Sequence, residues 1–143
     1  MILLDANLLL YAHSTTAPQR EAAQRWLAGE LAKRTEIGLA WVTITAFLRI
    51  ATNPRLYASP MTMLEALLVI DNYLSRSHVL KIDPTVNHWK YLQALCKASQ
   101  VTSRLVTDAH LAALAVEHGA TLCTTDRDFR RFDGLKLIDP LAA

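Results

Sequence analysis

Short apolar runs along this chain alternate with longer segments in which apolar residues recur every three or four positions. The short runs predict buried strands and the longer segments predict amphipathic helices. Such alternation is typical of an α/β fold with a mainly parallel sheet. The predicted strands are residues 1–4, 38–42, 79–82, 121–124 and 136–138. The predicted helices are residues 18–34, 44–52, 61–76, 84–98 and 104–118, with a short helical turn at 7–12.

Glycine and proline residues support these boundaries. Gly119 follows the last predicted helix, in the position where helices commonly end. Pro54 follows the second predicted helix, and Pro84 occupies the first turn of the fourth. The chain has no internal repeat, low-complexity tract or linker, so we expect residues 1–143 to form a single domain.

The third predicted helix carries an unusual excess of apolar residues. Between Met61 and Ile70 they occur on nearly every face, whereas a helix packed on a small sheet normally keeps one polar face. Either the monomer buries this helix completely or another protein chain covers it. We expect the second arrangement, with a homodimer as its simplest form.

Composition limits the class of protein. With 52% hydrophobic and 20% charged residues the chain is globular rather than disordered. Its formal charge of +2 is too small to indicate nucleic-acid binding by itself. Cys96 and Cys123 are predicted to be buried free thiols. Asp5 and Asn7 interrupt the first apolar run, and no stretch reaches the ~20 apolar residues of a membrane helix, so we expect a cytoplasmic protein.

Three aspartates stand at the ends of predicted elements. Asp5 follows the first strand, Asp126 follows the fourth, and Asp108 lies in the first turn of the helix between them. Each alone has an ordinary explanation, because aspartate caps helices and complements their dipoles. Together they predict a site, because ligands bind at the carboxyl ends of parallel strands and clustered carboxylates repel without a cation. Oxygen ligands favour Mg²⁺ or Mn²⁺, and no His or Cys pair has the spacing of a zinc site.

Four short stretches carry more specific information. In chain order they read LDAN at 4–7, FLRIATNPR at 47–55, VTDAHLAALA at 106–115 and TDRDF at 125–129. Together they resemble the PIN-domain ribonucleases, specifically toxins of the VapC type, over essentially the whole chain. The resemblance implies a three-layer α/β/α fold with a mainly parallel sheet. It also implies Mg²⁺- or Mn²⁺-dependent endoribonuclease activity that a small protein antitoxin inhibits.

The same resemblance implies roles for individual residues. Asp5, Asp108 and Asp126 would bind the metal, and Asp128 would add a further carboxylate, directly or through a neighbour. Asn7 would orient Asp5 or a water molecule, although a simple turn or cap explains this residue equally well. The expected reaction is in-line attack of metal-activated water on an RNA phosphodiester, with no covalent nucleophile.

One position departs from the family pattern. Members commonly carry a glutamate just before the Phe-Leu-Arg stretch, where this chain has Ala46. The site is then one carboxylate short, and three consequences are open: Asp128 compensates, one metal binds instead of two, or the enzyme is slow. An engineered alanine is a further hypothesis, because an active RNA-cutting toxin poisons the cell that makes it.

Several side chains near the motifs are candidates for RNA contacts. Arg127, Arg49 and Arg55 are candidates for binding phosphates, and an ordinary solvated face explains each of them equally well. The three tryptophans are candidates for stacking on bases, but their apolar surroundings favour the core or a partner interface. His110 is expected to be a structural or surface residue rather than a catalyst, and His118 is a poor candidate for a general base because it lies at the far end of its helix from Asp108.

Two other functions compete with the ribonuclease. An aspartate-nucleophile phosphatase also begins with a strand that ends in aspartate, but its second acid would stand where this chain has Asn7. The main alternative is a catalytically weakened PIN-like domain that acts as an RNA- or antitoxin-binding module, because Ala46 removes one acid. Retention of Asp5, Asp108 and Asp126 favours the nuclease.

Overall fold

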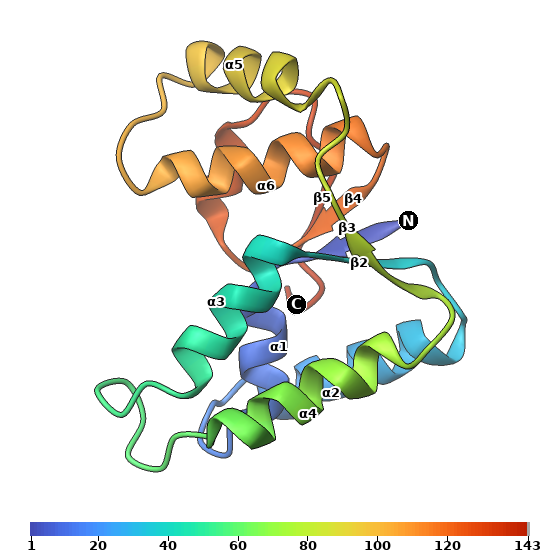
Figure 1. Ribbon diagram of the computed structural model, residues 1–143, viewed down its shortest axis with the longest axis vertical. Coiled ribbons are helices and arrows are strands. Elements are labelled where there is room, and N and C mark those ends of the chain that lie inside the picture. The colour runs from blue at the N-terminus through green and yellow to red at the C-terminus, as the bar shows by residue number, and fades with distance from the viewer. Residues whose placement is uncertain (143) are drawn as a thin grey trace.

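A five-stranded parallel sheet forms the centre of the computed structural model, which describes residues 1–142 (Figure 1). Each pair of neighbouring strands runs parallel. The strand order is β3-β2-β1-β4-β5, so β1 lies in the middle and contacts both halves of the sheet. The strands are β1 (Ile2–Leu4), β2 (Ile37–Ala40), β3 (Val79–Ile82), β4 (Thr121–Cys123) and β5 (Leu137–Ile138).

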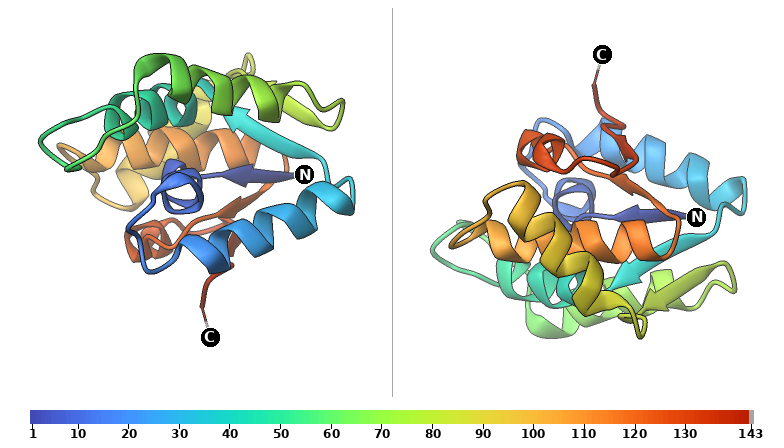
Figure 2. Two further views of the ribbon diagram at one scale, coloured as in Figure 1. Left: turned by 90° about the horizontal axis from the view of Figure 1, so that it is seen from below. Right: turned by 90° about the horizontal axis from the view of Figure 1, so that it is seen from above.

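Helices cover both faces of the sheet (Figures 1 and 2). Four pack on one face and two on the other, which confirms the predicted three-layer α/β/α fold. Within residues 1–142, no helix combines the length and apolar character needed to cross a membrane. The helices are α1 (Ala6–His13), α2 (Arg20–Ala32), α3 (Trp41–Ala51), α4 (Met63–Leu74), α5 (His88–Ala98), α6 (Leu105–Glu117) and the 3₁₀ helix η1 (Arg127–Arg131).

The central strands are apolar throughout because both of their faces are buried. Leu3 of β1 packs into the cluster beneath α6, and Leu4 packs into the cluster beneath α1 and α3. Both leucines are fully buried. In β2, Leu39 and Ala40 divide between the same two clusters. Side chains alternate between the faces of a strand, so a parallel strand covered on both sides reads as a continuous apolar run.

Most predicted boundaries lie within two residues of the observed ones, but the junction of β2 with α3 and the start of α5 differ more. The second strand ends two residues early, at Ala40, because Thr43 ties the start of α3 to the end of β1 through a buried hydrogen bond of 3.0 Å. The helix predicted for residues 84–98 is α5, which begins four residues later than predicted, at His88. The Glu117 carboxylate holds the preceding loop by accepting a hydrogen bond from the Thr85 amide at 2.9 Å. In both cases a contact distant in sequence sets the end of the element.

The tryptophans and cysteines divide between core and surface. Trp26 packs against the core, but Trp41 and Trp89 are exposed, so a core placement is wrong for these two. Trp41 lies at the start of α3, where its indole N–H donates to the Asp83 carboxylate at 2.9 Å. The two cysteines are free, as predicted, although only Cys123 is fully buried.

Candidate functional site

The candidate residues gather at the carboxyl edge of the sheet. β1 and β4 are direct neighbours, with Leu4 paired to Cys123, so Asp5 and Thr124 follow adjacent strand ends. The Asp5 amide donates to the Cys123 carbonyl at 3.0 Å, which extends the ladder to the first residue of the site. Parallel strands end at a common edge, and side chains that follow them therefore converge.

Asp5 is held in one orientation by the protein itself. One carboxylate oxygen, Oδ1, accepts a hydrogen bond from the Ala6 amide at 2.8 Å and caps α1. The other, Oδ2, accepts from the Thr124 hydroxyl at 2.6 Å. Burial raises the pKa of Asp5, although both hydrogen bonds act to lower it. Asp5 therefore caps α1 with one oxygen and is held by Thr124 through the other.

Thr124 connects the residues of this edge and was missed by the sequence analysis. Besides donating to Asp5, its buried hydroxyl oxygen accepts from the Asp126 amide at 3.0 Å. The Asn7 amide nitrogen lies 3.4 Å from the same oxygen and donates to the Thr125 hydroxyl at 3.0 Å. The sequence signal for this role was the pair Thr124-Thr125 between the predicted strand and Asp126, but formation of a local turn explains such a pair equally well.

Three carboxylates form a compact group beside Asp5. Asp108, Asp126 and Asp128 each offer an oxygen, and these oxygens lie within 4.8 Å of one another. Asp108 comes from the first turn of α6, and Asp126 caps η1 by accepting from the Asp128 amide at 2.9 Å. An oxygen of Asp128 thus lies among those of Asp108 and Asp126, where the sequence left a direct and an indirect role for this carboxylate open. Asp5 lies close enough for its charge to act on Asp108.

The acids destabilise one another's charged forms. The pKa of Asp108 is raised to about 6, first by burial and then by the negative charges of Asp126, Asp5 and Asp128. The Arg104 guanidinium opposes this rise. Repulsion of this kind favours protonation or a bound cation, and a cation restores the carboxylates at neutral pH.

The residues fit a hard divalent cation. The group offers only oxygen ligands, which Mg²⁺ and Mn²⁺ prefer. In addition, the buried Asn7 side-chain oxygen has no hydrogen-bond partner within residues 1–142. A buried polar atom without a partner is costly, so this oxygen is suited to a water molecule or ion at the same edge.

The other candidates divide between the site and its surroundings. Arg127 lies in η1 between two of the acids, whereas Arg49 lies in the last turn of α3 and Arg55 lies beyond its end. Ala46 lies one turn after Thr43, on the face of α3 that meets the end of β1. Helix geometry therefore brings position 46 towards the acidic edge.

The histidines form a separate network between α5 and α6. Glu117 bonds to His88 at 2.9 Å, and the other ring nitrogen of His88 bonds to His110 at 2.9 Å. His118 bonds to the Asp83 carbonyl at 2.8 Å. These contacts tie α6 to α5 and to the loop before it, so His110 and His118 both contribute to packing in this half of the fold.

A family comparison agrees with this geometry. Residues 2–135 match the family model described as the PIN domain. The chain belongs to the PIN-domain family. The predicted resemblance is thus confirmed across nearly the whole chain. Among curated PIN-domain relatives, Ribonuclease VapC37 of Mycobacterium tuberculosis is 39% identical over 142 residues, covering 99% of both chains. Ribonuclease VapC33 of the same species is 37% identical over 141 residues, again covering 99% of both.

Solved structures show the same fold at lower identity. VapBC2 from Rickettsia felis, bound to a DNA fragment from its promoter, matches with a TM-score of 0.70 at 20% identity, covering 96% of this chain and 98% of that one. FitAB bound to the IR36 DNA fragment matches with a TM-score of 0.72 at 17% identity, covering 100% and 97%. VapC20 of Mycobacterium tuberculosis, a sarcin-ricin loop cleaving toxin, matches with a TM-score of 0.65 at 14% identity, covering 95% and 99%.

Proposed function

We propose that this PIN-domain protein is a VapC-type endoribonuclease, the toxin of a toxin–antitoxin pair, and that it acts in the cytoplasm. The observation that carries the proposal is the oxygen group of Asp108, Asp126 and Asp128, backed by the hydrogen bond between Asp5 and Thr124. Relatives named ribonuclease VapC, at 31% to 39% identity, support RNA hydrolysis as the reaction.

The acidic group would hold Mg²⁺ or Mn²⁺ through Asp108, Asp126 and Asp128, with Asp5 beside them. A bound ion lowers the pKa of water and offsets charge that develops on the phosphate. The protein's own contribution is preorganisation. Because the backbone and Thr124 already fix the Asp5 carboxylate, little reorganisation is needed when substrate arrives.

Cleavage of total bacterial RNA by the purified protein tests the proposal. We expect cleavage with Mg²⁺ or Mn²⁺, loss of cleavage with EDTA, and loss of at least about a hundredfold in rate for Asp126→Asn. Asp71→Asn is the matched control, because Asp71 is an exposed carboxylate on α4 and should not affect activity. Cleavage that resists EDTA, or full activity of Asp126→Asn, would contradict a metal-dependent site.

The antitoxin surface in this proposal is the exposed side of α4. Ala66, Ile70 and Tyr73 of this helix face the core. Val69 and Leu74 are partly buried, but four further apolar side chains of α4 are exposed by 44% to 68%, and such a contiguous apolar patch is typical of an interaction surface. These exposed residues are Met63, Leu64, Leu67 and Leu68. The excess of apolar residues predicted for this helix is thus real, and the monomer covers only part of it.

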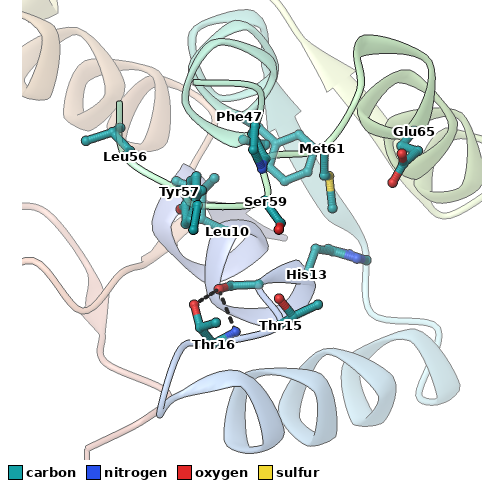
Figure 3. Close-up of a pocket in the computed structure, with 14 residues that line it drawn as sticks. Leu10, His13, Thr15, Thr16, Phe47, Leu56, Tyr57, Ser59, Met61 and Glu65 are labelled. Atoms are coloured by element: carbon teal, nitrogen blue, oxygen red, sulfur yellow. Dashed lines mark hydrogen bonds between the residues drawn. The ribbon is translucent and has the colours of Figure 1, made fainter. Parts of the chain in front are cut away.

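Two cavities adjoin this face and deepen it. One, of about 330 Å³, lies between α1, α3 and the loop before α4, where His13, Tyr57 and Met61 line it (Figure 3). The other, of about 410 Å³, lies between α2 and α4. His13 and Glu65 line both, so the two cavities share a wall. An amphipathic segment of an antitoxin, with apolar side chains for these cavities, fits such a surface.

Leu68→Glu separates the antitoxin surface from the nuclease site. We expect this variant to cut RNA normally but to escape inhibition by the small protein encoded beside it, because a charge would enter an apolar contact. Val86→Glu is the control, since Val86 is fully exposed in the loop between β3 and α5. Unchanged inhibition of Leu68→Glu would exclude this surface. If the wild type is a dimer and Leu68→Glu is a monomer, the surface belongs instead to the predicted homodimer.

A further inference from the structure

The loop between α5 and α6 brings an arginine to the acidic group. The Arg104 Nη1 atom lies 3.4 Å from Asp128 Oδ2, while the Arg104 side chain remains 80% exposed. We propose that Arg104 binds a phosphate of the RNA substrate at the entrance to the acidic site. This inference rests on the proposed ribonuclease function, and it adds a substrate contact that none of the sequence motifs contains.

A cation at this position reduces the electrostatic repulsion between the acidic site and RNA. Four aspartates lie at one edge of the sheet, and they repel the polyanionic RNA backbone that must approach them. A guanidinium presents N–H donors in a fork that matches two phosphate oxygens. Because exposed ion pairs contribute little to stability, Arg104 can exchange its contact with Asp128 for a phosphate at small cost.

The neighbouring arginines do not combine the same properties. Arg131 also pairs with the Asp128 carboxylate, at 3.8 Å, but its side chain is only 36% exposed. Its Nε atom donates to the Asp128 carbonyl at 3.1 Å, so this arginine braces η1. Arg127 and Arg130 are exposed, and neither forms an ion pair within the part of the chain that the structure describes. Two of these four arginines pair with the Asp128 carboxylate, and Arg104 is the more exposed of the two, at 80% against 36% for Arg131.

The backbone, rather than the ion pair, sets the position of Arg104. Gln100 and Ser103 adopt left-handed conformations, with φ of 50° and 60°, just before α6 begins. The Ser99 hydroxyl ties this loop to η1 by donating to the Arg131 carbonyl at 3.1 Å. Residues in such conformations persist where the surrounding structure fixes them. Arg104 therefore stays at the entrance when its partner changes from Asp128 to phosphate.

Arg104→Ala tests the proposal through RNA binding and kinetics measured separately. Binding to a fluorescein-labelled, mixed-sequence 20-mer RNA, followed by anisotropy in EDTA, should weaken about five- to tenfold. The slope of log Kd against log salt concentration should fall by about 0.7, the value for one contact to single-stranded nucleic acid. With Mn²⁺ and total RNA, KM should rise by a similar factor while kcat changes less than about twofold. Arg104→Lys should recover part of the affinity.

Arg25→Ala is the matched control. Arg25 is 76% exposed and forms an exposed ion pair with Glu21 at 3.5 Å, so its loss removes the same charge far from the acids. If Arg104→Ala binds and cuts RNA like Arg25→Ala, Arg104 is not a substrate contact, although the proposed ribonuclease stands. If Arg104→Ala instead weakens Mn²⁺ binding and leaves RNA affinity unchanged, Arg104 organises Asp128 and the inference is overturned. A wild-type protein that neither binds nor cuts RNA overturns the inference together with the proposed function.

Discussion

Asp108→Asn should stabilise the metal-free protein while abolishing its response to metal. The pKa of Asp108 rises from 3.8 to about 6, so its ionised form costs about 3 kcal/mol at most, at ~1.4 kcal/mol for each pH unit. Asp108 is partly exposed, and solvent screening reduces the cost to about 1–2 kcal/mol. Asparagine keeps the shape without the charge. The melting temperature in EDTA at pH 8 should therefore rise by about 3 to 7 °C.

The pH dependence of this gain has a defined sign. A carboxyl whose pKa is raised on folding binds its proton more tightly in the folded state. The wild-type penalty is therefore absent below about pH 3.8, grows between pH 3.8 and about 6, and is constant above. The stability difference between Asp108→Asn and wild type should accordingly be full at pH 7 to 8 and vanish near pH 4.

Thermal unfolding with EDTA or Mn²⁺ measures both effects. Saturation at about a hundred times Kd should stabilise the wild type by ~2.7 kcal/mol and leave Asp108→Asn unchanged, so the order of stability reverses on adding metal. Asp71→Asn, an exposed carboxylate on α4, should behave like wild type in both buffers. A variant no more stable than wild type in EDTA would refute the repulsion argument. Equal Mn²⁺ shifts in both proteins would refute Asp108 as a metal ligand.

Three further perturbations address other parts of the structure. Thr124→Val should weaken Mn²⁺ binding about tenfold in calorimetry, and Thr124→Ser should restore it, because only serine replaces the 2.6 Å donor to Asp5; equal affinities would remove this positioning role. Ala46→Glu should raise both Mn²⁺ affinity and the rate of RNA cleavage, whereas no gain would mean that the missing acid is not limiting. Gly38→Val should lower the free energy of unfolding in urea by about 1–3 kcal/mol, because a Cβ atom there would lie 2.7 Å from a side-chain carbon of Ile82. Gly29→Ala, where a Cβ atom meets nothing within 4 Å, is its control, and equal midpoints would contradict the packing argument.

The layered fold was predictable because its signal is local. The run at residues 1–4 is apolar throughout, a pattern typical of a strand that is covered on both faces. The aspartates that follow the predicted strands were predictable for a related reason, because parallel strands end at a common edge. Boundaries set by distant contacts were not predictable. The Glu117 carboxylate accepts a hydrogen bond from the loop before α5, and the sequence of that loop does not predict this contact.

The sequence by itself determined the α/β class, the acids at strand ends and the likeness to PIN-domain ribonucleases. Only the tertiary structure decided that Asp128 stands among the acids, that Thr124 holds Asp5, and that Arg104 reaches the same site. The physical reason is the range of each interaction. Periodicity along the chain reports which face of an element is buried, whereas the order β2-β1-β4 decides which strand ends become neighbours. Asp5 and Thr124 are 119 positions apart, and their contact exists only because β1 pairs with β4.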